Sequence, residues 1–303
     1  MPIPRPGPIV PANAKPGGRP TAPPPRTPFR PTTPNKSFTP VRWDSTNIGE
    51  KIIINGRSGM GKTSLATLLP GVVFMGIDRG GKNIRHPVTD EKLMVIPNVE
   101  TFEDVRAGLR AMIDTDHQFV VIDTINMAEK LGLAWTLQKV PGPNGSVATD
   151  IESYGFGKGY RYLFDTMSLP LLELDQLAEA GKHVVLLSQP ADNRVANASG
   201  EDYLCHGLGL AHRANASVAG LYTEWADHIF KIDYQNLSVV KANVKATKGK
   251  AVGNTERAIY TDGEVHFIAK SRQLADGSFM PPVVAFKDRT DDSVWQFMFK
   301  HLY

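Results

Sequence analysis

The sequence has a single cysteine, no long apolar run and, in its first 42 residues, no acidic side chain. Because Cys205 stands alone among 303 residues, an intrachain disulfide is excluded and a reducing compartment is expected. No apolar run approaches the roughly 20 residues that a membrane-spanning helix needs. The proline-rich N-terminus also lacks the apolar segment of a signal peptide. We therefore expect a cytoplasmic protein without a membrane partner.

Charge is distributed unevenly along the chain. The net charge is +3, but residues 1–42 hold seven lysines and arginines, which leaves −4 for the rest (3 − 7). The basic balance therefore belongs to the N-terminal segment and is no argument for nucleic-acid binding by the remainder.

Proline marks the same N-terminal segment, since residues 1–40 hold 14 of the 23 prolines and few large apolar side chains. Such a composition buries too little apolar surface to offset the entropy cost of ordering. We predict a disordered basic tail over residues 1–42 and one folded domain over residues 43–303. Three roles stay open for the tail: a solvated linker, a basic arm along phosphates, or a proline-motif ligand around residues 23–26.

A phosphate-binding loop is indicated at residues 56–63, where GRSGMGKT matches the Walker A pattern G-x-x-x-x-G-K-[ST]. The apolar run 51–55 predicts a buried strand before it, and residues 64–69 predict a helix after it. In this pattern Lys62 reaches the β- and γ-phosphates, and the Thr63 hydroxyl ligates Mg²⁺. The predicted phosphate-binding residues are Gly56, Arg57, Ser58, Gly59, Met60, Gly61, Lys62, Thr63 and Ser64.

Apolar runs alternate with helical patterns over much of the chain. Predicted strands at 71–78, 93–96, 118–123 and 183–188 alternate with predicted helices at 101–113, 127–138 and 160–180. Apolar strands separated by helices predict an α/β fold with a mostly parallel, doubly wound sheet. Ligands of such sheets bind beyond the carboxyl ends of the strands.

Three polar side chains fall at those predicted strand ends: Asp78, Asp123 and Gln189. The run 118–123 is apolar and ends in a carboxylate about sixty residues after the loop, which is typical of a Walker B strand. We therefore predict that Asp123 holds Mg²⁺ together with Thr63, directly or through water.

Two polar segments and a β-rich end complete the chain. Residues 139–157 predict a long loop, and residues 190–222 predict a second one. Predicted strands follow at 228–234, 237–246, 256–261 and 264–269, and a short apolar segment lies around 295–299. A lysine series runs through the hairpin region at Lys241, Lys245, Lys248 and Lys250.

Aromatic and cationic side chains gather around the end of the first loop. This mixture suits stacking and phosphate contacts on single-stranded nucleic acid, and equally suits packing of the rings against the following helix. The residues are Tyr154, Phe156, Lys158, Tyr160 and Arg161.

Cys205, His206 and His212 carry metal-ligand chemistry in the second loop. No second cysteine pair and no close acidic cluster completes a zinc site, so we interpret these three as loop residues.

The order of these pieces resembles the RecA-like branch of P-loop ATPases and, more narrowly, phage-encoded RecA-core proteins of the Sak type, some of which act in single-strand annealing and recombination. The resemblance covers residues 50–272 through the stretches GRSGMGKTSLA, IDRGG, FVVIDTI, YGFGKGYRYLFD, GKHVVLLSQ, LYTEWADHIFKI and AKSR. It implies ATP and Mg²⁺ as cofactors and single-stranded DNA and a single-strand-binding protein as partners. It also implies assembly into a ring or filament, and the host cytoplasm if the gene is viral.

Residue roles follow from the resemblance. Gln189 matches the position of a γ-phosphate sensor, and Lys270 and Arg272 resemble a Lys-x-Arg element that reaches the nucleotide of a neighbouring subunit. The family usually has a glutamate after the second strand, where this chain has Asp78-Arg79. Asp78 is therefore the residue that we expect to orient the attacking water.

That departure favours one rival function, a nucleotide switch or interaction module that binds ATP to assemble without hydrolysing it. A second rival is a helicase-like ring motor, and the lack of an evident separate helicase domain weighs against it. The guanine-reading Asn/Thr-Lys-x-Asp tetrad is absent, which favours ATP over GTP.

Overall fold

The computed structural model describes residues 40, 42, 47–77, 82–195, 197, 200–235, 238–241, 249–252 and 256–302. The chain divides into two units, Met1–Trp43 and Asp44–Tyr303, and the fold described below belongs to the second. The predicted tail, apart from residues 40 and 42, and Asp78 lie outside the described residues.

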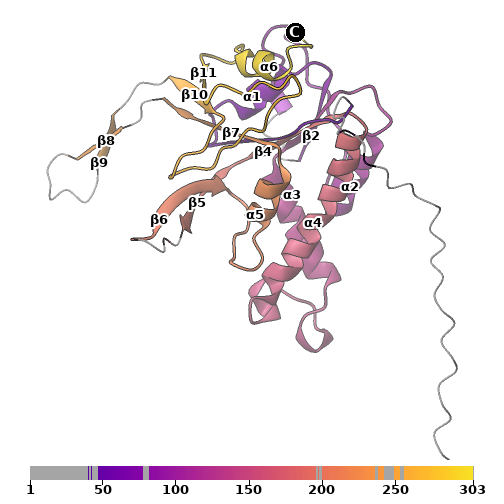
Figure 1. Cartoon of the computed structure of the whole chain (residues 1–303). Helices are drawn as coiled ribbons and strands as arrows, with labels where there is room; N and C mark the ends of the chain where they lie inside the picture. The colour runs from indigo at the N-terminus through magenta and orange to yellow at the C-terminus, as the bar shows by residue number, and fades with distance from the viewer. Residues whose placement is uncertain are drawn as a thin grey trace, which may run out of the picture. The chain divides into compact units, whose positions relative to one another are not determined.

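A seven-stranded sheet forms the centre of the fold, in the order β11-β10-β7-β1-β4-β3-β2 (Figure 1). The five strands from β7 to β2 are mutually parallel, and β10 and β11 are antiparallel additions at one edge. The strands are β1 (Lys51–Gly56), β2 (Val72–Gly76), β3 (Phe119–Asp123), β4 (His183–Ser188), β7 (His228–Tyr234), β10 (Arg257–Tyr260) and β11 (Val283–Phe286). The predicted mostly parallel α/β sheet is confirmed.

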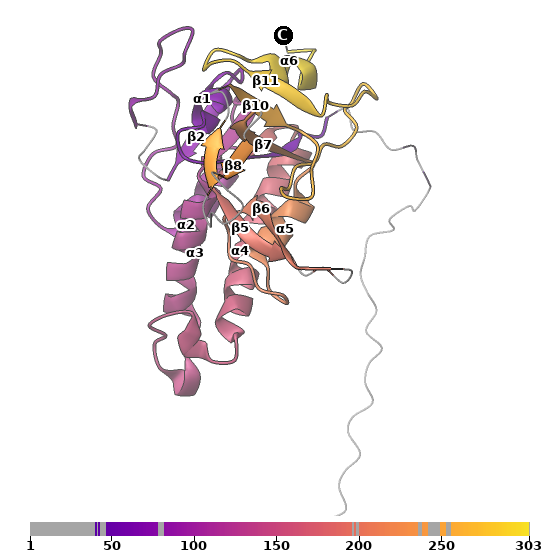
Figure 2. The ribbon, with the colours of Figure 1, turned by 90° about the vertical axis from the view of Figure 1, so that its left-hand side faces the viewer.

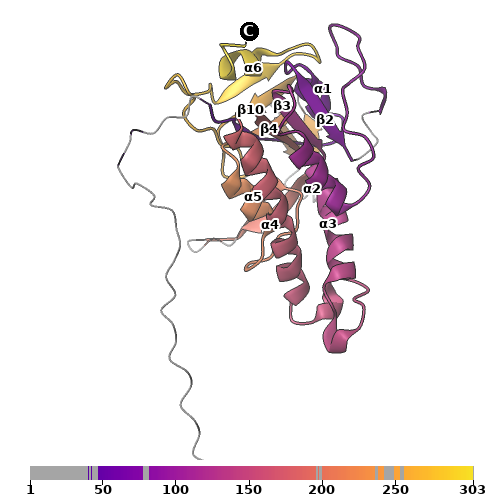
Figure 3. The same ribbon diagram turned by 90° about the vertical axis from the view of Figure 1, so that its right-hand side faces the viewer.

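Helices cover both faces of this sheet (Figures 1 and 3). Alternate side chains of a strand point to opposite faces, so Ile53 packs with α2, α3, α4 and α5, whereas Ile52 and Ile54 pack with α1 and α6. The helices are α1 (Lys62–Thr67), α2 (Phe102–Ala111), α3 (Ile125–Lys139), α4 (Lys158–Glu179), α5 (Val218–Trp225) and α6 (Ser293–Met298). No helix in the described part of the chain is long and apolar enough to cross a bilayer.

Helices α3 and α4 extend beyond the sheet as a pair (Figures 1 and 2). The segment that connects them contains two short 3₁₀ turns, Pro143–Gly145 and Glu152–Tyr154. It lies at the ends of the two helices that are far from the sheet (Figures 1 and 2). Near the sheet, the buried Glu173 of α4 binds Arg106 of α2, with 2.6 Å between Oε1 and Nη2.

Several predicted elements differ in the structure. Residues 93–96 form no strand; Val95 makes a single bridge to Phe74, in which the Phe74 N–H donates to the Met94 carbonyl and the Ile96 N–H donates to the Phe74 carbonyl. The predicted loop 190–222 instead holds a hairpin, β5 (Pro190–Val195) with β6 (Tyr203–Leu208), followed by α5. The polar side chains misled the prediction, since the exposed face of a hairpin is polar.

The C-terminal predictions need correction as well. Residues 264–269 form isolated bridges rather than a strand, because Glu264 and Phe267 pair with each other and turn the chain. Part of the predicted strand 237–246 is β8 (Ser238–Lys241), which pairs with β9 (Gly249–Val252), and residues 242–248 lie outside the described residues. Strand β11 was not predicted.

Candidate nucleotide-binding site

The loop between β1 and α1 lies at the carboxyl edge of the sheet, as the pattern predicts. Gly59 and Gly61 have φ values of 79° and 99°, a conformation that residues with a Cβ rarely adopt. The Lys62 ammonium donates hydrogen bonds to the carbonyls of Gly56 at 2.6 Å and Arg57 at 3.1 Å. The lysine therefore lies across the loop, where its charge is available to phosphate oxygens.

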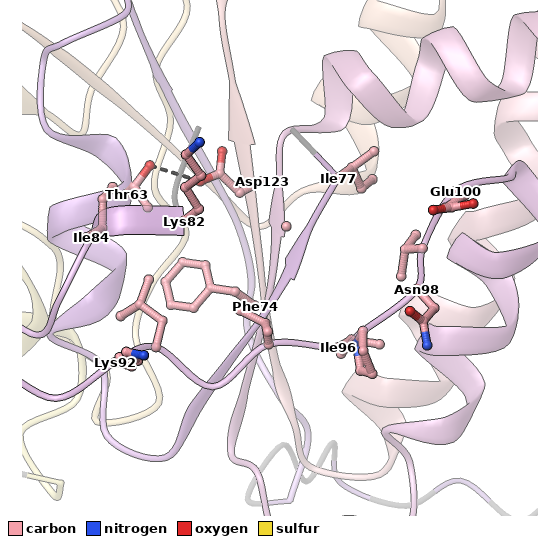
Figure 4. Close-up of a pocket in the computed structure, with 15 residues that line it drawn as sticks. Thr63, Phe74, Ile77, Lys82, Ile84, Lys92, Ile96, Asn98, Glu100 and Asp123 are labelled. Carbon is pink, nitrogen blue, oxygen red and sulfur yellow. Dashed lines mark hydrogen bonds between the residues drawn. The ribbon is translucent and has the colours of Figure 1, made fainter. Parts of the chain in front are cut away.

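Thr63 and Asp123 meet although one strand, β4, separates β1 from β3. The Thr63 hydroxyl donates to Asp123 Oδ2 at 2.9 Å (Figure 4). Asp123 is 7% exposed, so its carboxylate is held away from bulk water. A hydroxyl and a carboxylate are hard oxygen ligands of the kind that Mg²⁺ prefers, so this pair fits the predicted magnesium site.

A cavity of about 310 Å³ joins these residues to the strand end of β4. It is lined by Ser58, Gly59, Gly61, Lys62, Thr63, Ser64, Ile84, Asp123, Thr124 and Gln189. The structure thus brings most of the predicted phosphate and metal residues together with Gln189. Gly56, Arg57 and Met60 do not line the cavity; the Met60 side chain is buried in the core, and Arg57 is exposed.

Asn126, which was not predicted from the sequence, holds the backbone around Gln189. Its Oδ1 accepts from the Gln189 N–H at 2.8 Å, and its Nδ2 donates to the Gly209 carbonyl at 2.6 Å. The Gly209 N–H in turn donates to the Gln189 carbonyl at 2.7 Å. The two ends of the β5–β6 hairpin are therefore tied to the cavity wall. A polar residue in the first turn after a Walker B strand is the signal that could have identified Asn126.

Glu129 continues this contact one turn further along α3. Its Oε1 accepts from the Ala211 N–H at 2.7 Å. Burial raises the pKa of Glu129 to about 7, against the opposing effect of that hydrogen bond. The carboxyl is therefore partly protonated near neutral pH.

Lys270 and Arg272 lie beside the amino-terminal ends of the parallel strands, whereas the phosphate loop lies at their carboxyl ends. Lys270 pairs with Ile229 near the start of β7, and Arg272 Nε lies 3.3 Å from Asp227 Oδ1. Burial and the neighbouring Arg272 cation lower the pKa of Lys270. Because β1 and β7 are parallel and begin at this edge, neither side chain reaches the cavity of its own chain.

A second cavity, of about 460 Å³, adjoins the Thr63–Asp123 pair (Figure 4). Its walls are partly apolar, with Phe74 and Ile96, and Lys82 and Lys92 add two cations. Lys82 was not predicted, and a lysine following a glycine pair is no distinctive signal.

Cys205 is buried, and the two histidines of the predicted second loop each lie beside one polar side chain. His206 Nδ1 lies 3.0 Å from Asp192 Oδ1, and His212 Nδ1 lies 2.8 Å from Ser217 Oγ. Within the described part of the chain, no three His, Cys, Asp or Glu residues are grouped to hold a metal ion.

The loop, its lysine and the Thr63–Asp123 pair, on a sheet of this order, define a P-loop nucleoside triphosphatase core of the RecA-like kind. Residues 48–273 match the family described as an AAA domain, and the chain belongs to that family. No protein with a curated description matches the sequence.

Among solved structures, a KaiC-like protein, PH0186, from the hyperthermophilic archaeon Pyrococcus horikoshii OT3 is similar to this chain. It is 13% identical in sequence with a TM-score of 0.37, and the similarity covers 79% of this chain and 90% of that chain. A similarity this distant carries no information on function.

Proposed function

We propose that this protein is a Mg-ATP-binding, RecA-like ATPase that acts on single-stranded DNA in the recombination or replication of phage or bacterial DNA. The observation that carries the nucleotide part is the Thr63–Asp123 hydrogen bond of 2.9 Å beside the Lys62 ammonium. Charge and oxygen ligands converge there at the edge where sheets of this type bind ligands.

The proposed reaction is in-line attack of water on the γ-phosphorus, which breaks its bond to the β–γ bridging oxygen and releases ADP and phosphate. Lys62 balances charge on the β- and γ-phosphates, and Gln189 contacts the γ-phosphate from the strand end of β4. Mg²⁺, held by Thr63 and Asp123, supplies Lewis-acid charge neutralisation when bound. Asp78 orients the water, a role that rests on its sequence position alone.

One sequence feature favours a second candidate function. Arg79 follows Asp78 where the resembled family has a glutamate. Without that base, ATP would act as an assembly switch with little hydrolysis. Turnover measurements separate the two functions, because the switch binds Mg-ATP and releases almost no phosphate.

The aromatic residues that could contact DNA differ in exposure, which distinguishes a ring that packs from a ring that could stack on a base. Tyr154 is buried and donates to the Val140 carbonyl at 2.9 Å, so it packs. Phe156 is fully exposed, at 103% of its reference area, between Gly155 and Gly157, and all three residues have positive φ. An exposed ring beside the cation Lys158 suits stacking on an unpaired base. This placement supports Phe156 as the DNA contact.

We expect Phe156→Ala to weaken single-stranded DNA binding by about tenfold, since stacking contributes roughly 1–3 kcal/mol per base. Turnover of Mg-ATP, measured with and without single-stranded DNA, should keep its basal rate and need more DNA for stimulation. Phe279→Ala is the matched control, because Phe279 is 71% exposed elsewhere on the chain. If single-stranded DNA does not change the turnover of the wild type, the proposed action on DNA is wrong.

Assembly is the remaining part of the proposal. Lys270 and Arg272 face away from their own cavity, which is compatible with action on a neighbouring subunit's nucleotide in a ring or filament. A single-strand-binding protein remains the proposed auxiliary partner.

Mixing experiments test this role of Arg272. We expect Arg272→Ala subunits to lower the turnover of wild-type subunits more than dilution does, because each variant removes a cation from its neighbour's site. Arg194→Ala is the control, since Arg194 also pairs through Nε with an aspartate, Asp202, at 2.9 Å. If turnover falls only in proportion to dilution in both mixtures, Arg272 does not act on a neighbouring subunit's nucleotide.

A further inference from the structure

The chain beyond the AAA-domain match packs against the phosphate loop and its helix. The match ends at residue 273, and the following residues form β11 and α6. The indole N–H of Trp295 in α6 donates to the Leu65 carbonyl of α1 at 2.8 Å. Phe286 of β11 would lie 2.9 Å from a Cβ added to Gly61. The C-terminal strands and helix are therefore neighbours of the nucleotide site.

Arg257 of β10, which lies within the match, makes the most direct contact with the loop. Its Nη1 donates to the Met60 carbonyl, inside the loop, at 2.9 Å. The same nitrogen would lie 2.8 Å from a Cβ added to Gly61, so the guanidinium occupies the space that a side chain there would need. Glycine at this position accommodates both the positive φ and the arginine.

Phe286 fixes the direction of the Arg257 side chain. The guanidinium carbon lies 4.5 Å from the centre of the Phe286 ring, a cation–π contact that restricts the arginine's rotamers. Arg257 and Phe286 are also directly paired across β10 and β11. Strand β11 thus supports an arginine that reaches into the loop.

The register places Arg257 at the edge where phosphates bind. Strand β10 runs antiparallel to β7, with Arg257 opposite Tyr234 at the carboxyl end of β7. Gly56, where the loop begins, is opposite Ile232 on the same strand. Arg257 is half-buried, and among the described residues its guanidinium makes one hydrogen bond, to the Met60 carbonyl, and interacts electrostatically with the Asp288 carboxylate. Its other N–H donors are therefore available to an anion.

We propose that Arg257 is a positioning residue of the nucleotide site. It holds the phosphate loop through the Met60 carbonyl and places a permanent cation beside Gly61, where it favours the phosphates of a bound nucleotide. The strand pair β10–β11 then contributes to nucleotide binding, in addition to extending the sheet. This inference rests on the proposed binding of Mg-ATP.

Equilibrium binding of Mg-ATP and of adenosine by the full chain tests the role. We expect Arg257→Ala to weaken Mg-ATP binding by about ten- to a hundredfold, the range for hydrogen bonds to charged groups. Adenosine binding should change little, because adenosine has no phosphates. Arg257→Lys should recover part of the loss through its charge, but not all, because it lacks the planar group that stacks on Phe286.

Arg85→Ala is the control, because Arg85 also donates through Nη1 to a backbone carbonyl, that of Asp90 at 2.8 Å. The thermal midpoint of each ligand-free variant is measured alongside. Equal losses for Mg-ATP and adenosine, following a lowered midpoint, would mean a structural role only and overturn the inference. Unchanged Mg-ATP binding in Arg257→Ala would also overturn it. If the wild type itself binds no Mg-ATP, the proposed function fails first, which is a distinct result.

Discussion

Lys62→Ala should lower phosphate release by about 10²–10³-fold, the loss of turnover seen when one charge-stabilising donor is removed from an acyl-transfer site. It should also weaken Mg-ATP binding by about ten- to a hundredfold, the range for hydrogen bonds to charged groups. The ammonium is the cation closest to the loop carbonyls, bonded to Gly56 and Arg57, and an alanine offers phosphates no charge. Calorimetric titration with Mg-ATP and a phosphate-release assay measure the two effects.

Lys130→Ala is the matched control for this result, because Lys130 is exposed on α3. It should bind and turn over Mg-ATP as the wild type does. Circular dichroism of both variants checks that the fold is kept. Mg-ATP binding by Lys62→Ala within about threefold of the wild type would show that the nucleotide binds somewhere else.

Trp295→Ala should lower the free energy of unfolding by about 3–5 kcal/mol, the range for deleting a large buried aromatic side chain. Trp295 is fully buried, packs near Phe230 and Phe299, and bonds to the Leu65 carbonyl in the helix that follows the phosphate loop. Its loss therefore leaves a cavity and removes the indole donor from the Leu65 carbonyl, which keeps the longer bond from the Leu68 N–H at 3.3 Å. Urea denaturation with a fitted m-value measures the effect.

Phe297→Ala provides the control within the same helix, since Phe297 is 43% exposed. It should change the free energy of unfolding by about 0.5 kcal/mol or less. Trp295→Phe keeps most of the buried surface but loses the N–H, so it should fall between the two. A Trp295→Ala cost no larger than that of Phe297→Ala would contradict the packing role of α6.

The parts that could be predicted have local causes. A glycine loop between an apolar strand and a helix adopts its conformation from its own residues, which is why the sequence alone assigns Gly59, Gly61 and Lys62 to a phosphate loop. Asp123 and Gln189 could be placed because parallel strands align their carboxyl ends. The structure places these residues around one cavity.

The parts that could not be predicted depend on distant segments. The sequence predicts a loop where the β5–β6 hairpin lies, because its polar residues resemble those of a loop. Whether such a segment forms strands depends on its packing against the rest of the fold. Asn126 has a distinctive role only through Gly209, which lies 83 residues away in sequence. The strand predicted at 264–269 is wrong because Phe267 pairs with Glu264 and with the distant His206 in isolated bridges.

By itself, the sequence determined the chemistry of the phosphate loop, the strand that carries Asp123 and the class of the fold, since short-range periodicity and backbone preferences decide these. Only the tertiary structure decided which other residues share the site. Arg257 bonds to Met60, which is 197 residues away in sequence, whereas Lys270 and Arg272 lie beside the start of β7, at the opposite ends of the strands. Strand order and register cause this division, because they bring distant backbone segments together and no local pattern encodes them.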